Sequence, residues 1–172
     1  MALITEDGTG LTTAESLASV SAATTYHSVR GNAAWALLTN AQMEEALRRA
    51  TDYMEQIYRF LWAGYRKTTT QALSWPREQV PVQDAGSGYG TFPAYYSNTA
   101  VPTIVVNACA ELALKASAAT LFADQTQKVV SESVGPISVD YDRYSPQEKR
   151  YVAIDAMLSP FLASIKHEIV RT

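Results

Sequence analysis

The sequence is poor in the residues that carry metal binding and redox chemistry. Its 172 residues include one cysteine and two histidines. A zinc site needs several such ligands, and a lone cysteine cannot form a disulfide within the chain, so we expect neither kind of cross-link. Charged residues make up 18% of the sequence, below the ~25% typical of soluble domains. The fold must therefore depend on burial of the apolar residues, which make up 47%.

Long apolar runs and an excess of basic residues are also missing. The longest charge-free stretch, residues 85–110, is interrupted by glycines and prolines, so it predicts no membrane-spanning helix. Residues 1–10 contain no Lys or Arg, so we expect no secretory signal and a cytoplasmic origin. The net charge is −3 and the pI about 5.4. This balance argues against an extensive nucleic-acid clamp but leaves room for a small basic patch.

Helical periodicity dominates the pattern of apolar residues. It predicts helices over about 13–29, about 40–61 and about 102–122, and a last helix from Ser145 that Pro160 kinks or divides. The third of these is apolar around most of its girth, so we place it at the centre. Acids precede bases by four residues on the second helix, which predicts a solvated face: Glu44 and Arg48, Glu45 and Arg49, and Glu55 and Arg59. We predict a mainly α fold, a small bundle of about four helices.

Two segments depart from the helical pattern. Residues 80–101 form a long loop that contains Phe92, Tyr95 and Tyr96. Loops of this length are usually functional or disordered, and the aromatic residues favour burial against a partner. Residues 126–143 alternate around Gly135-Pro136 and predict a β-hairpin. We expect a single domain over 1–172, with an N-terminal arm (1–12), the loop 80–101, the hairpin 126–143 and a C-terminal helical segment (145–172).

The motifs of catalysis and cofactor binding are not found. Residues 86–90, Gly-Ser-Gly-Tyr-Gly, have the wrong spacing for a dinucleotide loop and follow no strand. Asp140 and Asp142 share a strand face without further ligands, so an exposed acidic face is the better interpretation. We therefore predict no enzymatic activity, no cofactor and no metal.

One region combines basic and aromatic residues, as single-strand-binding grooves do. Its bases are Arg48, Arg49, Arg59, Arg66, Lys67 and Arg77, and its aromatics are Tyr53, Tyr58, Trp62, Tyr65 and Trp75. Several of these aromatics also fit the core stripe of the second helix. Core packing is the favoured interpretation, and nucleic-acid binding is the alternative.

Short motifs along nearly the whole chain resemble one family. They are Glu6-Asp7-Gly8-Thr9-Gly10, Tyr26 with Arg30-Gly31-Asn32, Ala50-Thr51-Asp52-Tyr53, Ala72-Leu73-Ser74-Trp75-Pro76-Arg77, Glu111-Leu112-Ala113, Val134-Gly135-Pro136-Ile137, and Tyr151 with residues 155–160. In these motifs the chain resembles the tailed-bacteriophage head–tail connector (adaptor, head-completion) proteins. Some members of that family are described as DnaT-like single-stranded-DNA-binding proteins. The sequence departs from the pattern at Glu15-Ser16-Leu17.

The resemblance implies a structural virion protein of the phage neck, assembled in the host cytoplasm. It would form a dodecameric ring of identical subunits beneath the portal protein, extend the channel for genomic double-stranded DNA, and bind a downstream neck or tail protein. A single-stranded-DNA-binding protein is the alternative function. The residues we expect at interfaces are Trp75, Pro76, Arg77, Phe92, Tyr95, Tyr96, Val134, Gly135, Pro136, Ile137, Phe161 and Ile165.

Overall fold

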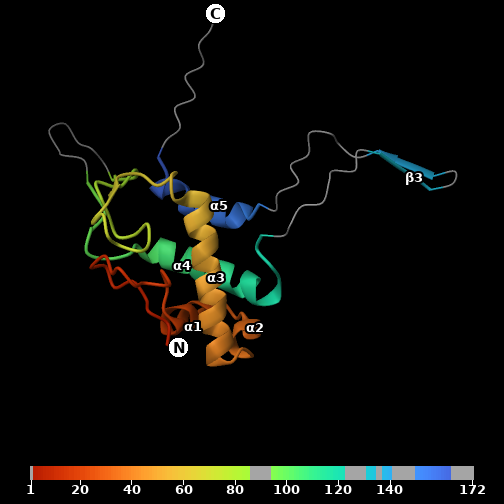
Figure 1. Cartoon of the computed structure of the whole chain (residues 1–172), viewed down its shortest axis with the longest axis horizontal. Coiled ribbons are helices and arrows are strands. Elements are labelled where there is room, and N and C mark those ends of the chain that lie inside the picture. The colour runs from red at the N-terminus through yellow and green to blue at the C-terminus, as the bar shows by residue number, and fades with distance from the viewer. Residues whose placement is uncertain (1, 86–93, 123–130, 135–136, 141–149, 164–172) are drawn as a thin grey trace, which may run out of the picture.

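The computed structural model describes residues 2–85, 94–122, 131–134, 137–140 and 150–163. The described chain is mainly helical with a small two-stranded hairpin, which confirms the predicted fold class (Figure 1). Its helices are α1 (Val20–Val29), α2 (Ala33–Ala36), α3 (Asn40–Tyr58), α4 (Thr103–Ala118), α5 (Val152–Leu158) and the 3₁₀ turn η1 (Ser159–Phe161). Its strands are β1 (Tyr65–Arg66), β2 (Arg77–Glu78), β3 (Ser131–Val134) and β4 (Ile137–Asp140).

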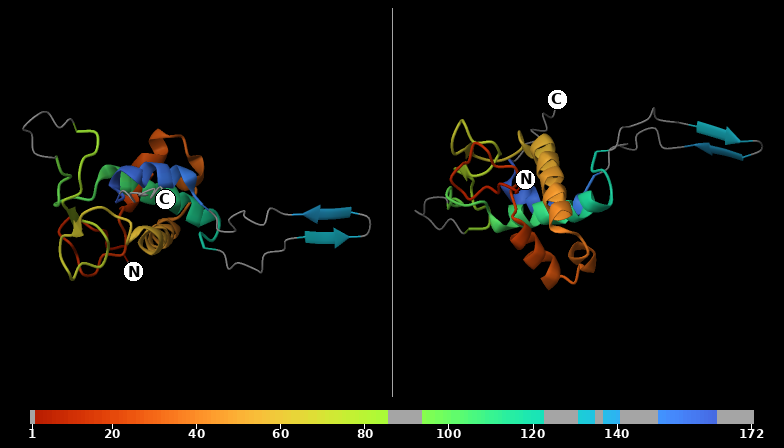
Figure 2. Two further views of the ribbon diagram at one scale, coloured as in Figure 1. Left: turned by 90° about the horizontal axis from the view of Figure 1, so that it is seen from above. Right: turned by 60° about the horizontal axis from the view of Figure 1, so that its bottom comes forward.

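Helix α4 lies at the centre of the fold, as its apolar girth predicts. It packs against α3, α1 and α5. The views in Figure 1 and Figure 2 show α3 crossing it, with α1 and α2 near the beginning of α3 and α5 near its end. The α4 residues that are fully buried are mostly small, including Ala108, Cys109 and Ala113. Such side chains let neighbouring helices approach closely, so many apolar contacts form without bulky residues.

Helix α3 begins where the sequence predicts, but it ends earlier than predicted. The Thr39 hydroxyl accepts a hydrogen bond from the Gln42 backbone N–H, and the Gln42 side chain accepts one from the Thr39 N–H. This reciprocal cap fixes the first turn. The helix ends at Tyr58, and residues 59–64 form a turn instead of the predicted continuation to 61.

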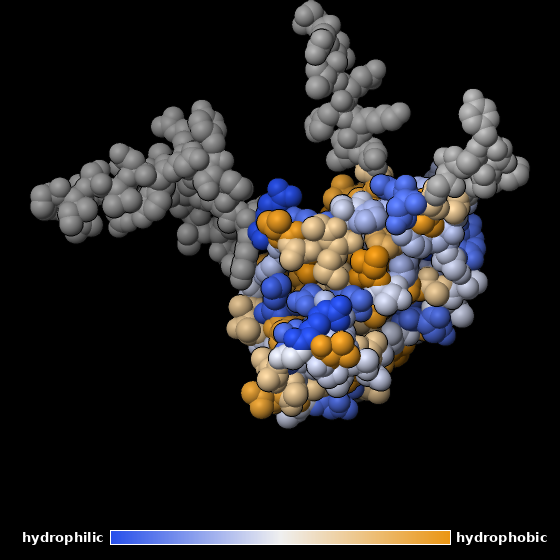
Figure 3. Space-filling model, turned by 180° about the vertical axis from the view of Figure 1, so that it is seen from behind, coloured by the Kyte–Doolittle hydropathy of each residue, from blue (hydrophilic) through white to orange (hydrophobic). Residues whose placement is uncertain are grey.

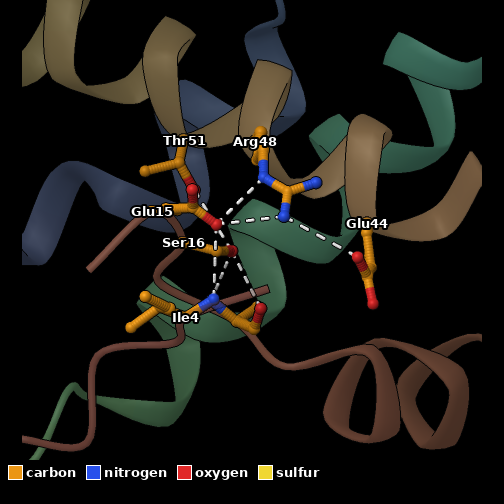
Figure 4. Close-up of polar contacts among 7 residues, drawn as sticks. Ile4, Glu15, Ser16, Glu44, Arg48 and Thr51 are labelled. Carbon is orange, nitrogen blue, oxygen red and sulfur yellow. Dashed lines mark hydrogen bonds and ion pairs between the residues drawn. The ribbon is translucent and has the colours of Figure 1, made fainter. Parts of the chain in front are cut away.

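The first predicted helix is the largest error of the secondary-structure prediction, because α1 begins at Val20 and not near residue 13. Ser19 caps α1 by accepting a hydrogen bond from the Ala22 N–H at 3.1 Å. The preceding segment consists of turns and irregular backbone, and it is bonded to itself and to α3 (Figure 4). There the Glu15 carboxylate accepts hydrogen bonds from the Ile4 N–H at 3.3 Å and from Arg48 Nε at 3.0 Å. Arg48 Nη2 also forms an ion pair with the Glu15 carboxylate at 3.0 Å, and the contact with Arg48 lowers the pKa of Glu15.

The predicted charge pairs on α3 are only partly present. Arg48 lies 3.7 Å from Glu44, as predicted. Glu55, however, accepts hydrogen bonds from the Ser74 N–H and hydroxyl, each at 2.7 Å. Glu55 is thus turned toward the loop that carries Ser74, no ion pair joins it to Arg59 among the described residues, and Arg59 is exposed at the end of the helix.

The other predicted segments are described in part. Within the predicted long loop, the Val82 N–H donates to the Ala94 carbonyl and the Tyr96 N–H to the Val80 carbonyl, so its two ends run side by side. The hairpin strands pair from Ser131 with Asp140 to Val134 with Ile137. The Gly135-Pro136 bend and Ser145 lie outside the described residues. The last helix does not run on from Ser145 as predicted, because Arg150 and Tyr151 are not helical and α5 begins at Val152. The α-helix breaks near Pro160 as predicted, because α5 ends at Leu158 and Pro160 lies in the 3₁₀ turn η1 that follows.

His27 is buried between α1 and α4 as a neutral imidazole. Its Nε2 donates to the Ala110 carbonyl at 3.0 Å, and its Nδ1 accepts from the Asn32 side-chain amide at 3.0 Å. The Trp35 and Tyr26 rings pack against it, and Glu111 and Arg30 are the charged groups nearby. Burial lowers the pKa of His27 below its usual value, because the charged form would lose its hydration.

We predict an acid-sensitive contribution of His27 to stability. The folded state has the lower pKa, so below about pH 6.5 the unfolded state binds more protons. Stability due to this group is therefore complete above that pH and decreases as the pH falls through it. Urea unfolding at pH 7.5, 6.5 and 5.5 measures the loss. His27→Gln keeps a donor and an acceptor and should weaken this pH dependence. An equal pH slope in both proteins would contradict the assignment.

Candidate nucleic-acid interface

Most of the aromatic residues in the predicted basic–aromatic region are part of the core. Tyr53, Tyr58, Trp62 and Trp75 are all buried, which confirms the core-packing interpretation for these four. The Tyr58 hydroxyl donates to Asp155 at 2.5 Å, and both burial and this carboxylate raise the pKa of Tyr58. The Trp75 ring lies edge-on to Trp62, with centroids 5.6 Å apart. None of the four offers a face for stacking.

A short turn after α3 does expose aromatic and basic side chains together. This segment, which includes β1, spans residues 59–67, and we refer to it as the 59–67 turn. Within it Phe60 is 91% exposed and Tyr65 is 69% exposed, and Arg59 is exposed as well. Arg66 and Lys67 follow directly and are half-buried. Sequence reasoning missed Phe60. The only available signal was that it falls off the apolar stripe of the second helix.

Arg77 fixes the path of this turn from within. Its guanidinium donates to the carbonyls of Ala63 at 2.8 Å and Gly64 at 2.8 Å, with a longer contact of 3.5 Å to the Trp62 carbonyl. A fourth bond reaches the Ser74 carbonyl at 3.2 Å. Burial lowers the pKa of Arg77, and Glu55 opposes that shift. A guanidinium group has five N–H donors in one plane, so it can bind several carbonyl oxygens that point toward it from different residues.

Gly64 allows the turn to approach β2. Its φ is +66°, and a Cβ built on it would lie 2.1 Å from the Glu78 carbonyl oxygen. No side chain fits there without displacing the backbone of β2. The close approach lets β1 pair with β2, with Tyr65 opposite Glu78 and Arg66 opposite Arg77.

The two cations at the end of the turn are held by backbone carbonyls. The Arg66 guanidinium donates to the carbonyls of Gln71 at 3.1 Å and Thr69 at 3.0 Å. Lys67 Nζ donates to the Gly8 carbonyl at 3.0 Å. Each contact uses only part of the donor capacity of a guanidinium or an ammonium group, so both cations are positioned and can still bind an anion.

The predicted interface residues are distributed over different environments. Trp75, Pro76, Arg77 and Phe161 are buried within this chain. Tyr95 is 52% exposed, whereas Tyr96 is half-buried and packs on the Phe161 ring with centroids 4.8 Å apart. Val134 and Ile137 are paired in the hairpin. Phe92, Gly135, Pro136 and Ile165 lie outside the described residues. A contact of these residues with other chains stays a prediction.

No other described surface gives an equally specific chemical signal. On the face opposite to Figure 1, hydrophobic patches are separated by hydrophilic residues (Figure 3). In the described part of the chain, no group of three or more His, Cys, Asp or Glu side chains could hold a metal ion. Nor is any helix in these segments long and apolar enough to cross a membrane.

Exposed aromatic rings beside basic side chains are features of proteins that bind single-stranded nucleic acids. Comparison with known proteins agrees with this class. The family described as "Putative DnaT-like ssDNA binding protein" matches residues 1–172, and the chain belongs to this family. No curated protein and no solved structure matches the sequence significantly.

The predicted assignment to the phage head–tail connectors is therefore wrong. The full-length match is to the DnaT-like family, and no comparison supports a connector. Four further predictions depended on that assignment and are wrong for the same reason. They are the neck function, the dodecameric ring, the portal and tail partners, and the passage of double-stranded DNA. The physical reason lies in the motif that suggested them: Trp75-Pro76-Arg77 packs inside its own chain and organises the 59–67 turn.

Gly64 and Gly31 provide a matched test of the geometry of the turn. Both have φ near +70°, but a Cβ at Gly31 would meet nothing within 4 Å. Gly31→Ala should therefore cost only the backbone strain, about 1 kcal/mol. Gly64→Ala adds the clash with Glu78 and should cost at least about 2 kcal/mol more. Urea unfolding of both variants measures the difference. Equal losses would show that β2 is not held against the turn.

Proposed function

We propose that this protein binds single-stranded DNA through the 59–67 turn and acts as a binding protein rather than as an enzyme. The observation that carries the proposal is the exposure of Phe60 and Tyr65 among Arg59, Arg66 and Lys67. The family match over residues 1–172 supports it independently of this geometry.

The two kinds of side chain contribute different parts of the binding energy. An aromatic ring stacks on any unpaired base, which contributes about 1–3 kcal/mol per base and depends little on sequence. The cations attract phosphates and release condensed counterions. Duplex DNA keeps its bases stacked inside the helix, so the rings favour single strands. With a net charge of −3 and three cations at the turn, binding should be weakened by salt.

Fluorescence anisotropy with a labelled oligonucleotide of about 12 nucleotides tests the proposal, since this length exceeds the smallest sites of known single-strand binders. We expect saturable binding that weakens with salt and a weaker interaction with the same sequence as a duplex. No binding at low salt would overturn the proposal. Trp75→Ala is unsuitable as a test, because Trp75 is fully buried and its loss would report on folding.

The stacking contribution is tested with Phe60→Ala and Tyr65→Ala. Each should lower the affinity for single strands about fivefold or more, as expected for a lost base–ring contact, with little change in the melting temperature because both rings are exposed. Leu37→Ala serves as the control, because Leu37 is 85% exposed and follows α2. Equal affinities for all of these variants and the parent protein would exclude stacking at the turn.

The phosphate contribution is tested with Arg59→Gln. Arg59 is exposed and has no ion pair among the described residues. If it contacts one phosphate, the slope of log affinity against log salt should become shallower by about 0.7. Arg49→Gln is the matched control, because Arg49 is exposed on α3, ten residues before Arg59. A change of slope in the control alone, or in neither variant, would place the phosphate contact elsewhere.

A further inference from the structure

Gln79 has an unusual backbone conformation next to the 59–67 turn. Among the described residues it is the only one other than glycine with a positive φ, at +57°. A residue with a Cβ is strained in this left-handed region. Glycine adopts this conformation without strain, and asparagine adopts it more readily than most other residues. Gln79 thus places a long side chain at a position where the backbone would favour glycine.

The position of Gln79 connects it to the exposed rings. Gln79 directly follows β2, in which Glu78 pairs with Tyr65. A Cβ on Gly64 would lie 3.0 Å from the Gln79 carbonyl carbon, so the backbones of the two residues are in close contact. Gln79 is exposed, and its amide has no hydrogen bond to any residue that the structure describes. Gln79 thus carries an exposed amide, free of hydrogen bonds to the described residues, on a backbone that contacts the 59–67 turn.

A free primary amide matches the edge of an unpaired base. It carries one acceptor oxygen and a donor NH₂ group. Each DNA base has a donor next to an acceptor on its Watson–Crick edge: N6–H and N1 in adenine, N1–H and O6 in guanine, N4–H and N3 in cytosine, and N3–H and O4 in thymine. Rotation of the amide by a half turn exchanges its donor and acceptor, so it can pair with any of the four. In a duplex these edges are already paired.

We propose that Gln79 is a specificity-determining residue that selects unpaired bases by pairing with their Watson–Crick edges. The inference rests on the proposed function. It deepens that function by assigning the recognition of unpaired bases, without sequence preference, to a residue outside the 59–67 turn. Stacking on Tyr65 and pairing with Gln79 would then hold one base by its face and its edge.

The variant Gln79→Gly separates this role from a structural one. It removes the amide and relieves the strain, so the melting temperature should stay the same or rise, whereas the affinity for single strands should fall about fivefold, as for a lost bidentate base contact. On an oligonucleotide of the same length that lacks bases, the parent protein and the variant should bind equally. Gln79→Asn keeps the amide and should retain more affinity than Gln79→Gly.

Three results would overturn the inference. One is unchanged single-strand affinity in Gln79→Gly. Another is an equal loss on the base-containing and the abasic strands, which would indicate an indirect effect. The third is a lower melting temperature, which would contradict the strain. These results are distinct from failure of the proposed function, in which the parent protein itself does not bind single strands. If the parent protein binds and Tyr65→Ala weakens binding while Gln79→Gly does not, only the role of Gln79 is wrong.

Discussion

The hydrogen bonds from the Arg77 guanidinium to backbone carbonyls are the interaction on which the candidate site depends. A buried cation is costly unless its donors are satisfied, and here the partners are carbonyls of Ala63, Gly64 and Ser74. No ion pair with Arg77 occurs among the described residues. The carbonyl oxygens must therefore be positioned to match the planar arrangement of N–H donors on the Arg77 guanidinium. The same bonds that satisfy the charge define the path of the chain between α3 and β1.

This constraint explains why the aromatic residues near the end of α3 divide into two groups. Trp62 and Trp75 are drawn into the core with Phe161, whose carbonyl accepts from the Ala63 N–H at 2.9 Å. Phe60 and Tyr65, which lie on either side of the carbonyls of residues 62–64 that Arg77 contacts, are left on the surface. Large rings that stay mostly exposed gain little burial energy from folding. Their exposure next to positioned cations is the physical basis for proposing that a ligand covers them.

The helical core was predictable because its signals are local and repeated. The cap at Thr39, the apolar girth of α4 and the break at Pro160 each depend on residues within a few positions of one another. The start of α1 was mispredicted because residues 4–18 satisfy their backbone and side-chain groups through contacts that include α3, such as the 3.2 Å bond from the Leu17 N–H to the Thr51 hydroxyl. Glu55 was mispaired for the same reason, since Ser74 is distant in sequence.

The sequence by itself determined the helical class, the central helix and the presence of a basic and aromatic region, because periodicity and composition are properties of the chain alone. Only the tertiary structure decided which members of that region are exposed. Arg77 was predicted at an interface and is an internal donor, whereas Phe60 was overlooked and is almost fully exposed. Exposure depends on which distant segments meet, and here that was decided by the carbonyls that one buried guanidinium can reach.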